Sequence, residues 1–222
     1  MSGGPREAAP RPARRIPWLT LFAVAFGFLE AAVVVYLREL YYPDGFRFPI
    51  VLIPERVAVV ELARELTTLL MLLATAVLAG RDRLDRFFVF AYLFGIWDLV
   101  YYIGLRVFAD WPDSLLTWDV LFLLPVPWLG PVLYPVLVSL LLIGGFLVHD
   151  WLRSAGRPMR LAAAELVVAV AGAVLVVVAF CWNWRAVAEG NVPGSFPVGI
   201  FLAGLVAGVA PYLRAALRAS RE

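Results

Sequence analysis

Residues 160–184 read RLAAAELVVAVAGAVLVVVAFCWNW, and after Glu165 this stretch contains no charged side chain. A helix needs about 20 mostly apolar residues to cross the hydrocarbon core of a bilayer. The whole chain of 222 residues is 63% hydrophobic and only 16% charged, whereas soluble domains are usually about half apolar and a quarter charged. The sequence therefore predicts an integral membrane protein.

Further apolar stretches lie on both sides of this segment, and together they predict an all-α bundle of six transmembrane helices. The predicted spans cover residues 16–41, 56–79, 86–108, 131–152, 160–184 and 197–217. They form one membrane domain over residues 16–218. The apolar run after Arg14 and Arg15 is too long for a signal peptide, so an uncleaved first span is expected. Residues 1–15 are rich in Gly, Pro, Ala and Arg and are expected to form a disordered cytoplasmic tail.

The positions of the arginines predict the orientation. All 19 basic residues are arginine, and 13 of them fall at the two chain ends or in the loops after the second and fourth spans. The positive-inside rule then places both ends in the cytoplasm, in a cell membrane of the bacterial inner-membrane type. Two ends on one side require an even number of crossings, which agrees with six.

The segment 111–135 does not have the pattern of a simple span. Asp113 or Ser114 can cap a helix over residues 114–124, and Pro125 and Pro127 would end it. Eleven helical residues cover roughly 16 Å, about half a bilayer. We therefore expect a short re-entrant or interfacial helix around 114–124, lying against the outer face of the bundle.

Five charged side chains away from the ends of the first three predicted spans are the strongest indication of a site, because each costs at least ~2.5–3.5 kcal/mol at membrane depth. They are Glu30, Glu61, Arg64, Glu65 and Asp98. Helical spacing places Glu61 and Glu65 on one side of the second span, and lipid would not tolerate any of these polar faces. The sequence thus predicts a polar pocket among spans one to three, opening toward the outer leaflet.

The predicted roles divide these residues into two groups. The candidate catalytic residues are Glu30, Glu61, Glu65 and Asp98, and the candidate substrate-binding residues are Arg64, Trp97, Tyr101, Tyr102, Trp118 and Asp119. Several carboxylates near one arginine cannot all ionise cheaply, so some are expected to hold protons, as acid–base catalysis requires. Their oxygens could also hold a hard divalent cation. No cofactor-binding or nucleotide-binding motif is present.

Three functions remain open at this point: an acid–base enzyme acting on a lipid-like or isoprenoid-like molecule, an accessory subunit of a membrane complex, and a proton- or cation-coupled transporter. The buried ions could also serve only to fix helix register. Expected partners are the lipid bilayer and a small lipid-like molecule. Small residues in spans five and six could form an oligomer contact, and nothing indicates nucleic acid. His149 and Asp150, at the end of span four, are expected to be solvated.

Overall fold

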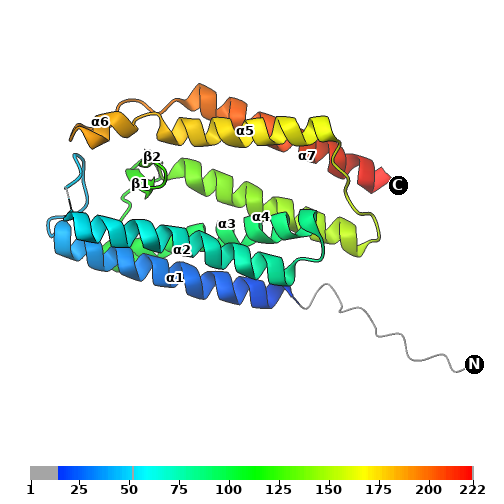
Figure 1. The fold of residues 1–222 in the computed structure, drawn as a ribbon, viewed down its shortest axis with the longest axis horizontal. Helices are drawn as coiled ribbons and strands as arrows, with labels where there is room; N and C mark the ends of the chain where they lie inside the picture. Colours follow the sequence, from blue (N-terminus) through cyan, green and yellow to red (C-terminus); the bar gives the residue numbers. More distant parts are fainter. Residues whose placement is uncertain (1–14, 52, 222) are drawn as a thin grey trace, which may run out of the picture.

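The computed structural model describes residues 15–51 and 53–221, in which long helices dominate (Figure 1). The long helices are α1 (Ile16–Tyr41), α2 (Glu55–Ala79), α3 (Arg83–Ala109), α4 (Leu133–Ser154), α5 (Ala163–Cys181) and α7 (Val198–Arg221). The short elements are β1 (Trp118–Phe122), β2 (Trp128–Pro131) and the five-residue helix α6 (Trp184–Ala188). Each long helix begins and ends within a few residues of a predicted span, so the helical part of the prediction is confirmed.

Five helical segments within the described residues are long and apolar enough to cross a membrane. They are Ile16–Tyr41, Arg83–Ala109, Leu133–Ser154, Ala163–Ala188 and Val198–Arg221. These segments indicate a multi-pass membrane protein. Helix α2, which carries Glu61, Arg64 and Glu65, is not among the five, so the count of six spans stays a prediction.

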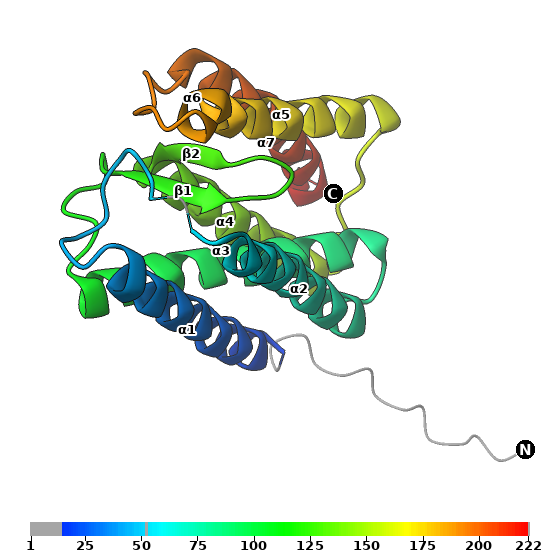
Figure 2. The same ribbon diagram turned by 60° about the vertical axis from the view of Figure 1, so that its left-hand side comes forward.

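Helix α3 lies at the centre of the bundle, and α1, α2 and α4 pack against it (Figure 2). Its side chains Val89 and Leu93 are fully buried in the main apolar core, together with Leu72 of α2 and Phe146 of α4. Helices α1 and α2 each contact α3 more extensively than they contact each other. A seam between α1 and α2 is therefore available for other groups.

Helices α5 and α7 form a closely packed pair on one side of the bundle (Figure 1). A Cβ atom on Gly172 of α5 would lie 2.6 Å from the carbonyl oxygen of Gly204 in α7, a distance that real side chains do not adopt. Small residues allow helix backbones to approach this closely in membranes. The first residues of α1 and the last residues of α7 lie at the same end of the bundle, which agrees with an even number of crossings.

The expected helix around 114–124 is wrong, because residues 118–131 form a β-hairpin whose first strand lies in this segment, and the fold is therefore not entirely α-helical. Strand β1 pairs antiparallel with β2, and Trp118 lies opposite Pro131. Trp118, Val120 and Phe122 are aromatic or β-branched residues, which favour strands. Pro125 lies in the connection between the strands and would in any case interrupt a helix.

Candidate functional site

A cavity of about 340 Å³ lies between α1, α2, α3, strand β1 and the loop after α1. Its charged lining residues are Glu30, Arg38, Glu61, Arg64, Glu65 and Asp98. The structure therefore brings together all four candidate catalytic carboxylates and Arg64. Most of the remaining lining is aliphatic or aromatic, which is typical of pockets that bind small organic molecules.

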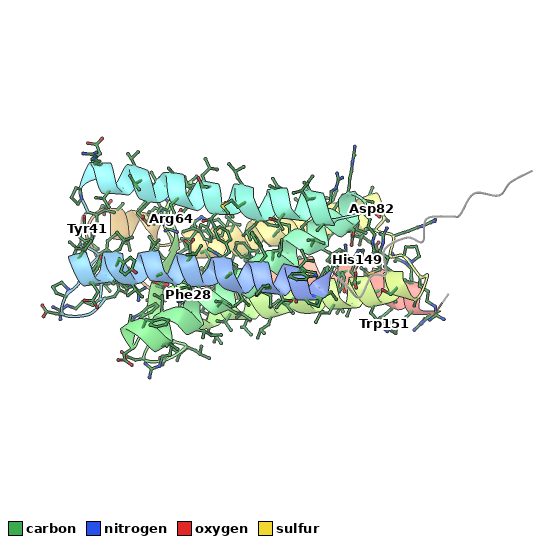
Figure 3. The ribbon with its side chains drawn as sticks, turned by 90° about the horizontal axis from the view of Figure 1, so that it is seen from below. Phe28, Tyr41, Arg64, Asp82, His149 and Trp151 are labelled. Carbon is green, nitrogen blue, oxygen red and sulfur yellow. The ribbon has the colours of Figure 1, made fainter. Side chains whose placement is uncertain are left out.

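Arg64 holds the carboxylates of α1 and α2 together. Its Nε and Nη2 atoms donate hydrogen bonds to Glu61 at 2.9 and 2.7 Å, and its Nη1 forms an ion pair with Glu30. Thr68 donates a further hydrogen bond of 3.1 Å to Glu30. Figure 3 shows Arg64 between α1 and α2. Because Glu30 and Glu61 share one guanidinium, they act together as its counter-ions.

The other two candidate carboxylates have no ion-pair partner within the described residues. Glu65 accepts the backbone N–H of Leu123, just after β1, at 3.0 and 2.9 Å from its two oxygens. Asp98 accepts the Ser139 hydroxyl from α4 at 2.7 Å. Both side chains are buried, with exposed fractions of 6% and 7%. Their hydrogen bonds tie the hairpin and α4 to the cavity wall.

Arg38 and Asp119 form a second buried ion pair toward the end of the cavity that contains the hairpin. Nη2 of Arg38 donates to Asp119 at 3.0 Å. The guanidinium of Arg38 also lies 3.8 Å from the ring centroid of Trp111 and 4.5 Å from that of Phe46. Aromatic faces stabilise such cations. Asp119 thus acts as the partner of a lining residue, while its own side chain is not part of the cavity lining.

Three of the candidate binding aromatics, Trp97, Tyr101 and Tyr102, line the cavity, but Trp118 does not. The ring of Trp118 packs against Phe196, with their centroids 6.3 Å apart, in a separate aromatic cluster beside α5 and α7. The cavity is lined by β1 only from Val120 onward, so Trp118, at the start of the strand, lies beyond it.

A second opening between α1 and α2 adjoins the cavity and shares Glu30 and Arg64 with it. Its volume is about 270 Å³, and its other lining residues are four apolar side chains, including Leu29 and Met71, and two threonines. Leu29 is 59% exposed and Met71 is 43% exposed. In a bilayer this crevice would connect the charged cavity sideways to the lipid.

A second charged cluster, which the sequence analysis did not predict, lies at the opposite end of the bundle. Arg15 donates to Asp85 at 2.7 and 2.8 Å and to Asp150 at 2.6 Å. His149 Nε2 lies 3.2 Å from Asp85, and its ring stacks on Phe88. Figure 3 shows His149 at the end of the bundle away from Tyr41.

The expectation that His149 and Asp150 are solvated is therefore wrong, because their exposed fractions are 2% and 5%. Both lie in the last turns of α4, where a charged flank normally faces water. The only sequence signal was the pairing of arginines and aspartates at several span ends. That pattern does not specify which of these groups meet.

No group of three or more His, Cys, Asp or Glu side chains within the described residues is arranged to hold a metal ion. The divalent cation therefore stays a prediction.

No family model, no curated protein and no solved structure matches this chain.

Proposed function

We propose that this protein binds a lipid-like or isoprenoid-like molecule in the cavity between α1, α2, α3 and the hairpin, and performs acid–base chemistry on it. The observation that carries this proposal is a mainly apolar cavity in which four carboxylates and two arginines converge. Apolar walls would hold the body of such a molecule, and the few polar groups would orient its reactive end.

The hydrogen bonds suggest a division of roles among the four carboxylates. Glu30 and Glu61 are occupied by Arg64, so their main role in the proposal is to position that guanidinium. Glu65 and Asp98 have no such counter-ion in the described part of the chain, and each has remaining acceptor capacity. We therefore assign the proton-transfer step to Glu65 or Asp98.

The crevice between α1 and α2 supports a lipid-soluble molecule over a water-soluble one. It joins the cavity at Glu30 and Arg64 and is otherwise lined by four apolar side chains and two threonines. A molecule could therefore enter sideways from the bilayer without crossing water. We place this entry in the outer leaflet, with both chain ends in the cytoplasm of a bacterial-type inner membrane, on the basis of the arginine distribution.

A coupled transporter remains an alternative, but the packing gives it less support. Such a protein needs a polar path that reaches both membrane faces in turn. Between the cavity and the Arg15 cluster lies the main apolar core, including Leu72, Val89 and Leu93, all of them fully buried. An accessory subunit is the other alternative, with the exposed apolar faces of α5 and α7 as its contact surface for a homo- or hetero-oligomer.

Filling the cavity provides the test of binding. Ala58 lines the cavity, whereas Ala63 is on the same helix and is exposed. Each alanine is replaced by tryptophan, and the proteins are purified in mild detergent and analysed by native mass spectrometry. We expect a co-purifying amphiphile with the wild type and with Ala63→Trp, and its loss with Ala58→Trp. Equal retention in both variants would exclude this cavity as the binding site.

Chemistry on the bound molecule is tested separately. Membranes from cells that produce the wild type or Asp98→Asn are compared by lipid mass spectrometry. The asparagine can still accept the Ser139 hydroxyl, so the fold should persist while proton transfer is lost. We expect a precursor to accumulate with the variant. Identical lipid profiles with retained binding would indicate a carrier or subunit in place of an enzyme.

A further inference from the structure

We propose that the molecule bound in the cavity carries a positively charged head group, an amine, with a hydroxyl or other oxygen acceptor next to it. This inference rests on the proposed function, because it assumes that an amphiphile occupies the cavity. It adds the chemical class of the head group, which follows from the balance of charges and from two unpaired N–H donors.

The ion pairs leave an excess of negative charge around the cavity. Arg64 is shared by Glu30 and Glu61, and Arg38 pairs with Asp119. Two guanidinium groups therefore face three carboxylates before Glu65 and Asp98 are counted.

Glu65 and Asp98 add two more carboxylates, and their described hydrogen bonds come from neutral donors, a backbone N–H and a serine hydroxyl. Buried charges in proteins are normally paired. With all five carboxylates ionised, the formal charge of the set is 2 − 5 = −3. A cationic head group would supply the missing partner for Glu65 and Asp98.

Aromatic rings beside these carboxylates are suited to the same head group. Trp97, Tyr101, Tyr102 and Phe122 all line the cavity. An ammonium group is attracted to the face of such rings, and the attraction is greatest where water is excluded. Arg38, stacked between Trp111 and Phe46 nearby, already uses this kind of contact within the protein.

Two buried donors on the cavity wall indicate that the head group also contains an oxygen. Trp97 is 4% exposed and Arg38 is 9% exposed. Nε1 of Trp97 and Nη1 of Arg38 have no hydrogen-bond partner within the described residues. Buried N–H groups are rarely left without an acceptor. Both residues line the cavity, but neither nitrogen has accessible surface as the side chains lie, so a hydroxyl or ester oxygen next to the amine would accept from either donor after a small shift of the side chain; a bare alkylamine could not.

The proposal is tested with three probes of equal chain length, added to the purified full chain in nanodiscs. Sphinganine carries an amine and two hydroxyl groups. N-acetylsphinganine has the same hydroxyl groups without the charge, and octadecylamine has the charge without the hydroxyl groups. Native mass spectrometry measures binding, and empty nanodiscs correct for partition into lipid. We expect sphinganine to bind about tenfold more tightly than N-acetylsphinganine, which corresponds to about 1.4 kcal/mol, with octadecylamine in between.

The double variant Glu65→Gln, Asp98→Asn should lose most of the preference for sphinganine over its acetylated form. The matched control Glu189→Gln, at an exposed position outside the cavity, should keep it. If the double variant does not fold, Asp98→Asn alone serves, because asparagine preserves the acceptor for Ser139.

The outcomes separate the two proposals. Equal or tighter binding of N-acetylsphinganine, or an unchanged preference in the folded variant, would overturn the cationic head group and leave the proposed function standing. Tighter binding of octadecylamine than of sphinganine would overturn the oxygen acceptor. Binding of none of the three probes, together with retention of amphiphile by Ala58→Trp, would contradict both proposals.

Discussion

Both carboxylate oxygens of Glu65, in the middle of α2, accept the backbone N–H of Leu123, at distances of 3.0 and 2.9 Å. The two residues are 58 positions apart in the sequence. The hydrogen bond fixes the end of β1 against α2 and so closes one wall of the cavity. Glu65 therefore has a structural role whether or not it also transfers a proton.

This contact predicts a difference between two substitutions of Glu65. Glu65→Gln retains a side-chain oxygen that can accept from Leu123, so the free energy of unfolding should change little. Glu65→Leu leaves the buried N–H without a partner and should lower it by about 1–3 kcal/mol. Chemical unfolding in mild detergent measures both values. Equal effects of Gln and Leu would contradict the role assigned to this hydrogen bond.

Arg15 should contribute strongly to stability, because it is the shared partner of two buried aspartates. Arg15→Gln leaves Asp85 and Asp150 without their cation, and breaking a buried pair in this way costs about 3–5 kcal/mol. The control is Arg153→Gln, which breaks an exposed ion pair with Asp82 and should cost at most about 1 kcal/mol. Thermal unfolding of the two variants in the same detergent makes the comparison. Similar losses of stability in the two variants would show that burial does not determine how much these ion pairs stabilise the fold.

Asp82 caps the N-terminus of α3, since its side chain accepts the backbone N–H of Asp85 at 3.0 Å. Asp82→Ala should lower the free energy of unfolding by about 1 kcal/mol. Asp82→Asn should lower it much less, because asparagine is also a good N-cap residue. Unfolding of both variants measures the difference. The cap is refuted if alanine and asparagine have the same effect.

The same cap has a predicted pH dependence. The hydrogen bond from Asp85 lowers the pKa of Asp82, and Arg153 lowers it further. A carboxylate with a lowered pKa in the folded state stabilises the fold above its unfolded pKa of ~3.9, and this contribution is lost as the pH falls through the folded value. The stability difference between wild type and Asp82→Ala should therefore shrink below about pH 4. A difference that is constant with pH would contradict this assignment.

Close packing of α5 and α7 predicts that Gly172→Ala weakens the contact between these helices. Its new methyl group would lie 2.6 Å from the Gly204 carbonyl oxygen, so the backbones must separate. A methyl group added at Gly199, also on α7, would have no neighbouring atom within 4 Å. Gly199→Ala should therefore leave the stability of the fold unchanged or raise it slightly. Thermal unfolding and the yield of folded protein measure the effect. Equal unfolding temperatures and equal yields of the two variants would show that α5 and α7 can move apart without loss of stability.

Six crossings predict a definite pattern of labelling with a membrane-impermeant thiol reagent. In a Cys181→Ser background, cysteines replacing Ser154 and Ser220 should react from one side, and cysteines replacing Asp44 and Glu189 from the other. All four positions are exposed. The arginine distribution assigns the first pair to the cytoplasm. Labelling of Ser154→Cys and Asp44→Cys from the same side would contradict the six-span prediction.

The positions of the long helices and the grouping of charges on spans one to three could be predicted from the amino-acid sequence. Hydrophobic length and helical spacing are local properties, so the helices could be predicted, and so could the common direction of Glu30, Glu61 and Glu65. The arginine pattern also predicted two ends on one side, which agrees with the arrangement in Figure 1.

Which of these charged groups form pairs could not be predicted from the sequence. That Arg64 bridges Glu30 and Glu61, that Glu65 holds Leu123, and that Arg15 meets Asp85 depends on how helices distant in sequence pack against α3. The hairpin was mispredicted for the same reason. A short apolar segment with a polar first residue has similar local preferences for helix and strand, and the outcome depends on strand pairing and on the contact with α2 that a single segment does not contain.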